Sequence, residues 1–279
     1  MSAPFDYGRR SRDYAVHRHG PPSEIYERLA KWIEFRGAEV LDVATGPGTV
    51  AFDLARRGAT VTGIDMSEAQ VEAARVRAAE LGLDGYTSFR VARAEDTREP
   101  EASFDVVTAG QSWHWFDGPT VAGEARRVLR PGGTLAIIAY SYLAAHSDVA
   151  GDSESLVLEY NPGWTMAGWT GLFPRWVEHV IEGGMEFVEQ FCWDYDELYS
   201  HEDWRGRIRT CNGVGSGGMS AEDVEAFDAA HEAMLRARYP DPVPIRHRLW
   251  CVVARRDDTW RRNQVHVGSG HGRRSTGPR

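Results

Sequence analysis

Short apolar runs alternate with helical patterns along the chain between Val40 and Tyr140. This alternation predicts a doubly wound α/β fold, in which crossover helices connect the strands of a mostly parallel sheet. The predicted strands are Val40–Val43, Thr60–Ile64, Ser88–Val91, Phe104–Ala109 and Thr134–Tyr140. Two later apolar runs, Phe187–Trp193 and Leu249–Ala254, are expected to pair as an antiparallel hairpin at the edge of the sheet.

The helices between these strands carry recognisable start and stop signals. The clearest one spans Ser67 to Leu81, because Ser67 and Gln70 have capping-box spacing and Gly82 follows as a stop. Ser23, after two prolines, can cap an N-terminal helix. Further helices are predicted over Gly123–Leu129, where Arg130-Pro131-Gly132-Gly133 forms a turn, and from Ser220 to a stop before Pro240.

These elements divide the chain into three zones. Residues 1–36 form an N-terminal segment, and residues 37–255 form one main domain with inserts at about 141–185 and 195–245. The segment 256–279 lacks periodicity and is expected to be a disordered tail. No apolar run approaches the length of a membrane span and the N-terminus shows no signal peptide, so we expect a cytoplasmic protein without membrane contact.

Composition excludes several classes of partner. The chain of 279 residues has a formal net charge of −9, which opposes binding to the phosphates of a nucleic acid. Its three cysteines show no CxxC spacing, and its acidic residues are scattered on helix faces, so neither a disulfide framework nor a metal site is predicted. The oligomeric state stays open.

The main candidate for chemistry is the segment Val40–Thr49 with Asp65 at the end of the following strand. Glycines at a strand-to-helix turn let a ligand approach the backbone, and a carboxylate about 20 residues further on can hold a ribose diol. Both dinucleotides and S-adenosylmethionine bind in this way. Asp42 favours S-adenosylmethionine, because a carboxylate beside the loop opposes a pyrophosphate but attracts the ammonium group of a methionine moiety.

Several motifs in order resemble the class I S-adenosylmethionine-dependent methyltransferases, in the type 11 or ubiquinone/menaquinone-biosynthesis-like branch. The resemblance extends from about Tyr14 to Ala139. Its motifs are Val40–Thr49, Gly63–Ser67, Ala94-Glu95, Ser103–Val107, Trp113–Asp117 and Val128–Gly133. It implies a seven-stranded sheet with the last strand antiparallel, an N-terminal lid over the cofactor, and an insert that roofs the acceptor site.

The resemblance also implies roles for individual residues at the cofactor. Gly46 and Gly48 would line the methionine moiety, Asp65 would bind the ribose hydroxyls, and Met66 would pack on the adenine. The remaining residues assigned to the cofactor are Asp42, Ala44, Ala94, Glu95 and Gln111. Two positions depart from the pattern: Ala44 stands where many relatives have the first glycine, and Arg93 where many have an aspartate.

The acceptor site is expected at the carboxyl edge of the sheet, where the segment from Gln111 to Asp117 follows the fourth strand. His114 is a candidate general base; equally, His114 and its neighbour Trp113 can be packing residues around the cofactor. Tyr14, in the N-terminal segment, is either a catalytic residue or an aromatic lid residue. His201 is a further catalytic candidate. Trp113 is a candidate substrate contact, as are Asn161, Trp164, Trp169 and Arg205 in the insert.

These residues predict in-line methyl transfer to a small aromatic or heteroaromatic acceptor, because aromatic walls suit a planar ring. An indole carbon is the most specific hypothesis, since such an atom needs alignment more than it needs a base. The alternatives are O-methylation of a phenol or carboxylate, and a protein that binds S-adenosylmethionine without transferring its methyl group. A nicotinamide oxidoreductase is disfavoured by Asp42.

Overall fold

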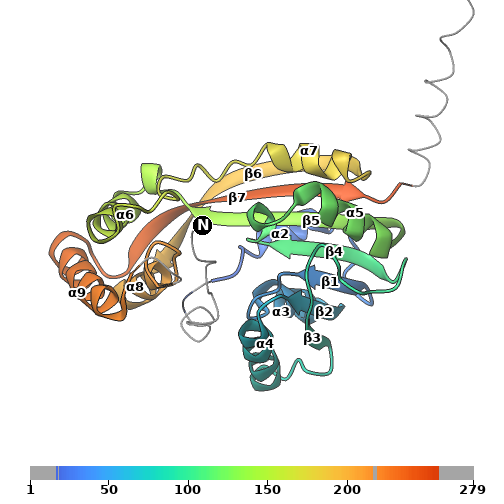
Figure 1. The fold of residues 1–279 in the computed structure, drawn as a ribbon, viewed down its shortest axis with the longest axis horizontal. Coiled ribbons are helices and arrows are strands. Elements are labelled where there is room, and N and C mark those ends of the chain that lie inside the picture. The colour runs from blue at the N-terminus through green and yellow to red at the C-terminus, as the bar shows by residue number, and fades with distance from the viewer. Residues whose placement is uncertain (1–16, 18, 216–218, 258–279) are drawn as a thin grey trace, which may run out of the picture.

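The computed structural model describes residues 17, 19–215 and 219–257, and these form one mixed sheet covered by helices (Figure 1). The strand order is β3-β2-β1-β4-β5-β7-β6. Strands β1 to β5 run parallel, whereas β7 is antiparallel to both β5 and β6. The strands are β1 Glu39–Val43, β2 Thr60–Asp65, β3 Thr87–Val91, β4 Phe104–Gly110, β5 Leu129–Tyr142, β6 Glu186–Tyr199 and β7 Val243–Arg255.

Helices lie between most of the strands as far as β5, and the later helices, except α7, gather at its far end. The first group is α2 Glu24–Leu29, α3 Thr49–Arg56, α4 Glu68–Glu80 and α5 Gly118–Val128, with the 3₁₀ turn η2 Trp113–Trp115 before α5. The second group is η3 Ala144–His146, α6 Asp148–Tyr160, α7 Arg175–Glu182, α8 His201–Arg209 and α9 Ala221–Arg238.

The seven predicted strands and the antiparallel hairpin are confirmed. In α4, Ser67 caps the helix by accepting a hydrogen bond from the amide of Gln70, and Ser220 caps α9 in the same way. Ser23 precedes α2, but its side chain makes no cap hydrogen bond. The predicted turn after α5 interrupts the pairing of β4 with β5, which passes from Leu129 directly to Thr134.

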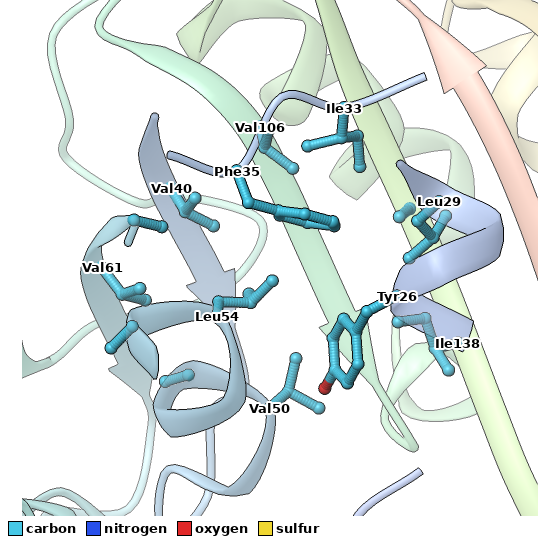
Figure 2. Packing of buried hydrophobic residues seen from close by; sticks show 14 of the residues in the cluster. Tyr26, Leu29, Ile33, Phe35, Val40, Val50, Leu54, Val61, Val106 and Ile138 are labelled. Carbon is cyan, nitrogen blue, oxygen red and sulfur yellow. The ribbon is translucent and has the colours of Figure 1, made fainter. Parts of the chain in front are cut away.

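Two apolar cores sandwich the sheet. On one face, α2, α3 and α4 pack against alternate strand residues; Figure 2 shows Tyr26, Leu29, Phe35 and Leu54 around this core. The other face packs against α5 and α7. Because strand side chains alternate between faces and both faces are buried, the strands read as continuous apolar runs.

A third core joins α6, α8 and α9 to the ends of β5 and β7. We call these three helices the helical lobe; Figure 1 shows them beyond the ends of β5, β6 and β7. They come from both predicted inserts, 141–185 and 195–245. Helix α7 also lies in the first insert, but it packs beside α5 on the sheet and not in the lobe. Across the described segments, no helix is long and apolar enough to cross a membrane.

Candidate functional site

The turn between β1 and α3 has the backbone conformation of a ligand-binding loop. Gly46 and Gly48 adopt φ values of 55° and 87°, which glycine tolerates best. A side chain at Gly48 would collide with the ring of Phe52, whereas a Cβ at Gly46 would meet open space. Ala44 is also left-handed, with φ of 49°, which explains why glycine suits this position in the resembling family.

Asp65 ties this loop to the end of β2. One carboxylate oxygen accepts a hydrogen bond from the Gly46 amide at 3.0 Å, and the other accepts one from the Ser67 amide at 2.9 Å. Burial raises the pKa of Asp65, although these amide hydrogen bonds act in the opposite direction. The carboxylate therefore fixes the loop and α4 relative to each other.

Asp42 lies deeper, at the carboxyl end of β1, and is 1% exposed. Both of its oxygens accept hydrogen bonds of 2.6 Å, from the hydroxyls of Thr45 and Thr108. Burial raises its pKa to about 6, against the effect of these hydroxyls. A cation bound nearby would favour the charged form.

The residues assigned to the adenine lie at the ends of β2 and β3. The Met66 side chain is 72% exposed, and such a large apolar group is available to pack against a ligand ring. Ala94 is buried, and Glu95 pairs with Arg93 at 3.3 Å. Arg93, the departure noted in the sequence, therefore has a local carboxylate partner.

Gln111 clamps the end of β4 to the end of β5. Its side-chain amide donates to the carbonyl of Tyr140 at 2.8 Å, and its side-chain oxygen accepts from the Tyr140 amide at 2.9 Å. Its own backbone is left-handed, with φ of 54°, and donates to the carbonyl of Ile138. This geometry turns the chain away from the sheet and into η2.

The turn η2 presents His114 beside a buried anchor. Trp113 is 1% exposed and donates its indole N–H to Nδ1 of His179 on α7 at 3.3 Å. The ring of His114 lies 4.7 Å from that of Trp115 and 4.9 Å from that of Trp169. Trp113, which the sequence assigned to the substrate, is thus buried against α7, whereas His114 lies among aromatic side chains.

His114 opens into a cavity of about 100 Å³ between the sheet edge and the helical lobe, which we call the acceptor cavity. The ends of β4 and β5 contribute Gln111, His114, Trp115, Ser141 and Tyr142. The lobe and the loop before α7 contribute Glu154, Trp164, Met166, Trp169, Arg207, Cys211 and Asn212. Candidate residues from two distant parts of the sequence, His114 with Trp164 and Trp169, therefore share one cavity.

The sequence reasoning missed several polar groups in this cavity. Arg207 donates to the sulfur of Cys211 at 3.3 Å and lies over the ring of Tyr142, 5.2 Å from its centroid. Glu154 accepts a hydrogen bond of 2.7 Å from the amide of Gly168. These residues carry no local motif. The one available signal was their position in the predicted inserts.

Three of the predicted insert residues lie elsewhere. Asn161 donates to the carbonyl of Gly213, and His201 interacts through Nε2 with the carbonyl of Pro240. Arg205 pairs with two carboxylates on α9, those of Asp228 and Glu232. Because these contacts hold the lobe together, we assign the three residues a structural role and do not include them in the proposed acceptor site.

A smaller cavity, which we call the cofactor-side cavity, lies against the first residue of α3. Gln111 and Arg207 line both cavities, so the two are neighbours. The other residues that line it are His19, Thr49, Tyr140, Glu197, Tyr199 and His247.

The described end of the N-terminal segment docks beside this cavity. His19 bonds Glu197 at 2.6 Å and stacks on Tyr199, and His17 bonds Asp203 at 3.1 Å. The Glu197 carboxylate raises the pKa of His19 through this hydrogen bond. The candidate Tyr14 lies outside the described residues, and the predicted lid over the cofactor remains a prediction.

Comparisons with known proteins agree with this geometry. Residues 41–137 match the model of the methyltransferase domain family. Nocamycin O-methyltransferase from Saccharothrix syringae is 45% identical over 118 residues, 40% of this chain and 42% of that protein. The 27-O-demethylrifamycin SV methyltransferase from Amycolatopsis mediterranei is 38% identical over 135 residues, 47% of this chain and 50% of that protein. The match thus spans about half the length of these relatives.

The similarity to solved structures extends further than the sequence similarity. The [4+2]-cyclase SpnF aligns over 92% of this chain and 98% of its own, with a TM-score of 0.56 and 20% identity. At this identity the likeness establishes the fold alone. The matched family, the sheet order with its antiparallel β7 and the glycine turn point to one conclusion. Residues 41–137 are similar to the methyltransferase domain family, and the sheet around them has the fold of the class I S-adenosylmethionine-dependent methyltransferases, in which the glycine-rich turn is the cofactor site.

Proposed function

We propose that this protein methylates a hydroxyl group of a small acceptor that carries an aromatic ring and binds in the acceptor cavity. The observation that carries the proposal is the cavity itself, in which His114 lies among Trp115, Trp164 and Trp169. S-adenosylmethionine, when bound, supplies an electrophilic methyl group that the acceptor oxygen displaces in line. The chain must align that oxygen and receive its proton.

The residues of the cavity divide these tasks. The tryptophan side chains provide flat apolar walls that hold a ring. His114 is the candidate proton acceptor, because a neutral imidazole can take a proton from a hydroxyl near neutral pH. Gln111 lies between the acceptor and cofactor-side cavities, and its clamp on Tyr140 fixes the distance between them.

Two arguments favour oxygen over the indole carbon as the methylated atom. A ring carbon needs stacking but no proton acceptor before the attack, so a histidine in the wall has more use with a hydroxyl. The similar nocamycin enzyme is named as an O-methyltransferase. The fold by itself does not establish methyl transfer, since it also occurs in a [4+2]-cyclase.

The test is incubation of the purified protein with S-adenosylmethionine bearing a deuterated methyl group. Phenols, carboxylic acids and indoles are offered separately, and products are detected by mass spectrometry and located by NMR. A labelled ether together with S-adenosylhomocysteine supports the proposal. Label on an indole carbon would overturn the choice of oxygen. If the protein binds S-adenosylhomocysteine but methylates nothing in the panel, the proposed acceptor class is wrong.

A further inference from the structure

Glu154 is a carboxylate in an unusual place. It lies on α6, is 6% exposed and lines the acceptor cavity but not the cofactor-side cavity. Burial of an ionised carboxylate costs several kcal/mol unless partners compensate for the lost water. A carboxylate that lines a ligand cavity at this cost is therefore expected to bind a group of the ligand.

The protein partners of Glu154 compensate for its charge in part. The amide of Gly168 donates to one carboxylate oxygen of Glu154 at 2.7 Å. Burial nevertheless raises the pKa of Glu154. The hydrogen bond that Glu154 accepts comes from a neutral backbone amide.

The walls beside Glu154 suit a cation. Trp115, Trp164 and Trp169 line the same cavity, and Trp164 donates its indole N–H to Asn212 at 2.7 Å. This hydrogen bond holds the ring of Trp164 in place. The faces of tryptophan rings attract ammonium groups, and the attraction grows when water is excluded.

Arg207 places a positive charge on one side of the acceptor cavity. Its guanidinium lies over Tyr142 and lines both cavities, so its positive charge marks the boundary with the cofactor-side cavity. A cationic group on the acceptor would be repelled from this boundary and attracted toward Glu154. Negative and positive charges at different parts of one cavity orient a polar ligand.

We propose that the acceptor carries an amine, bound as an ammonium group by Glu154 and the tryptophan faces, with its hydroxyl directed toward His114 and the cofactor. The inference rests on the proposed function and refines it by naming the acceptor class as a hydroxylated aromatic amine. Glu154 is then a specificity-determining residue. It takes no part in the proton transfer.

Three phenols of matched size test the charge preference: tyramine, which is cationic, tyrosol, which is neutral, and 4-hydroxyphenylacetate, which is anionic. Each is titrated into the protein saturated with S-adenosylhomocysteine, with calorimetry as the readout. We expect tyramine to bind at least about tenfold more tightly than the other two. Equal binding of tyramine and tyrosol, preference for the anion, or no binding of any probe would overturn the inference.

The substitution Glu154→Gln removes the charge and keeps an oxygen for the Gly168 amide. We expect tyramine to lose about tenfold in affinity, and tyrosol and S-adenosylhomocysteine to bind as in the wild type. Glu159→Gln, at an exposed position of the same helix, is the matched control. Unchanged tyramine binding in Glu154→Gln would overturn the inference. The proposed function would still stand if tyrosol or 4-hydroxyphenylacetate were methylated on oxygen.

Discussion

The cofactor half of the sheet, β1 to β4 with α3 and α4, and the helical lobe hold their polar groups in different ways. In the cofactor half, Asp65 accepts hydrogen bonds from two backbone amides, and Asp42 accepts them from one hydroxyl in the loop after β1 and one on β4. In the lobe, Arg205 and Asp228 link two helices through side chains alone. The cofactor half therefore holds its acids with amides and hydroxyls at the ends of strands, whereas the lobe joins two of its helices through opposite charges.

The two regions also respond in opposite directions to pH. The buried carboxylate of Asp42 has its pKa raised to about 6, whereas burial lowers the pKa of His231 in the lobe and of His247 at its base to about 4. Acid thus favours the neutral form of Asp42 but forces a charge onto the two histidines. This difference in pH response and the division between cofactor and acceptor sites can each be tested by substitution.

The largest expected effect is a loss of turnover without a change in cofactor binding. We expect His114→Ala to lower kcat about 100-fold or more, because the proton of the acceptor hydroxyl loses its receiver. Affinity for S-adenosylhomocysteine, measured by calorimetry, should stay the same, since His114 lines the acceptor cavity but not the cofactor-side cavity. His146→Ala, an exposed histidine in η3, is the control. Full turnover in His114→Ala would remove His114 from the mechanism.

The second effect concerns the stability of the lobe in acid. Between pH 6.5 and about 4 the unfolded chain binds protons at His231 and His247 that the folded chain excludes, so stability falls as the pH falls. The expected loss is about 3 kcal/mol for each histidine by pH 4, at about 1.4 kcal/mol per pKa unit.

Urea unfolding at several pH values measures this loss. The substitution His231→Gln keeps a hydrogen-bonding group near Ser153, to which His231 Nε2 is 2.9 Å away, but cannot be protonated in this range. We expect the slope of unfolding free energy against pH to fall by about 1.4 kcal/mol per pH unit relative to the wild type. An identical slope in the variant would show that His231 is not buried in its neutral form.

The third effect concerns the cofactor loop. Replacement Asp65→Ala leaves the amides of Gly46 and Ser67 without their acceptor, at a cost of about 1–3 kcal/mol, and removes the predicted ribose contact. We expect a loss of affinity for S-adenosylhomocysteine of about 10- to 100-fold in calorimetry. Glu68→Ala, exposed at the start of α4, serves as the control. Wild-type affinity in Asp65→Ala would mean that the ribose lies elsewhere.

The smallest effect tests whether Asp42 faces the ammonium group of the cofactor. With a pKa of about 6, Asp42 is partly protonated at pH 6, and a nearby cation would expel that proton. Binding of S-adenosylhomocysteine at pH 6 should therefore release up to about half a proton. Calorimetry in two buffers of different ionisation enthalpy measures this number. The release should vanish in Asp42→Asn; if the wild type releases no proton, the ammonium group binds away from Asp42.

Much of the fold could be predicted because the relevant signals are local. The apolar runs located all seven strands, and the spacing of Ser67 and Gln70 marked the start of α4. The ends of β5, β6 and β7 extend beyond the apolar runs, because pairing with a neighbouring strand continues where the side chains become polar. Such pairing depends on a partner far along the chain and leaves no mark in the periodicity.

The acceptor site likewise combines residues that the sequence identified with residues that it did not. The sequence pointed to His114, Trp164 and Trp169 by residue type, but it gave equal standing to Arg205, which the structure places in an ion-pair cluster on the lobe. It gave no weight to Glu154, an ordinary glutamate in a helical pattern.

By itself, then, the sequence determined the glycine turn, the acid at the end of β2 and the parallel sheet, because each depends on residues that are near one another in the chain or on one strand. The tertiary structure decided which side chains of the lobe face the acceptor cavity. Helices α6 and α8 are separated along the chain by α7 and β6, and their relative rotation is set by the packing of the third core. A residue's access to the cavity follows from that rotation.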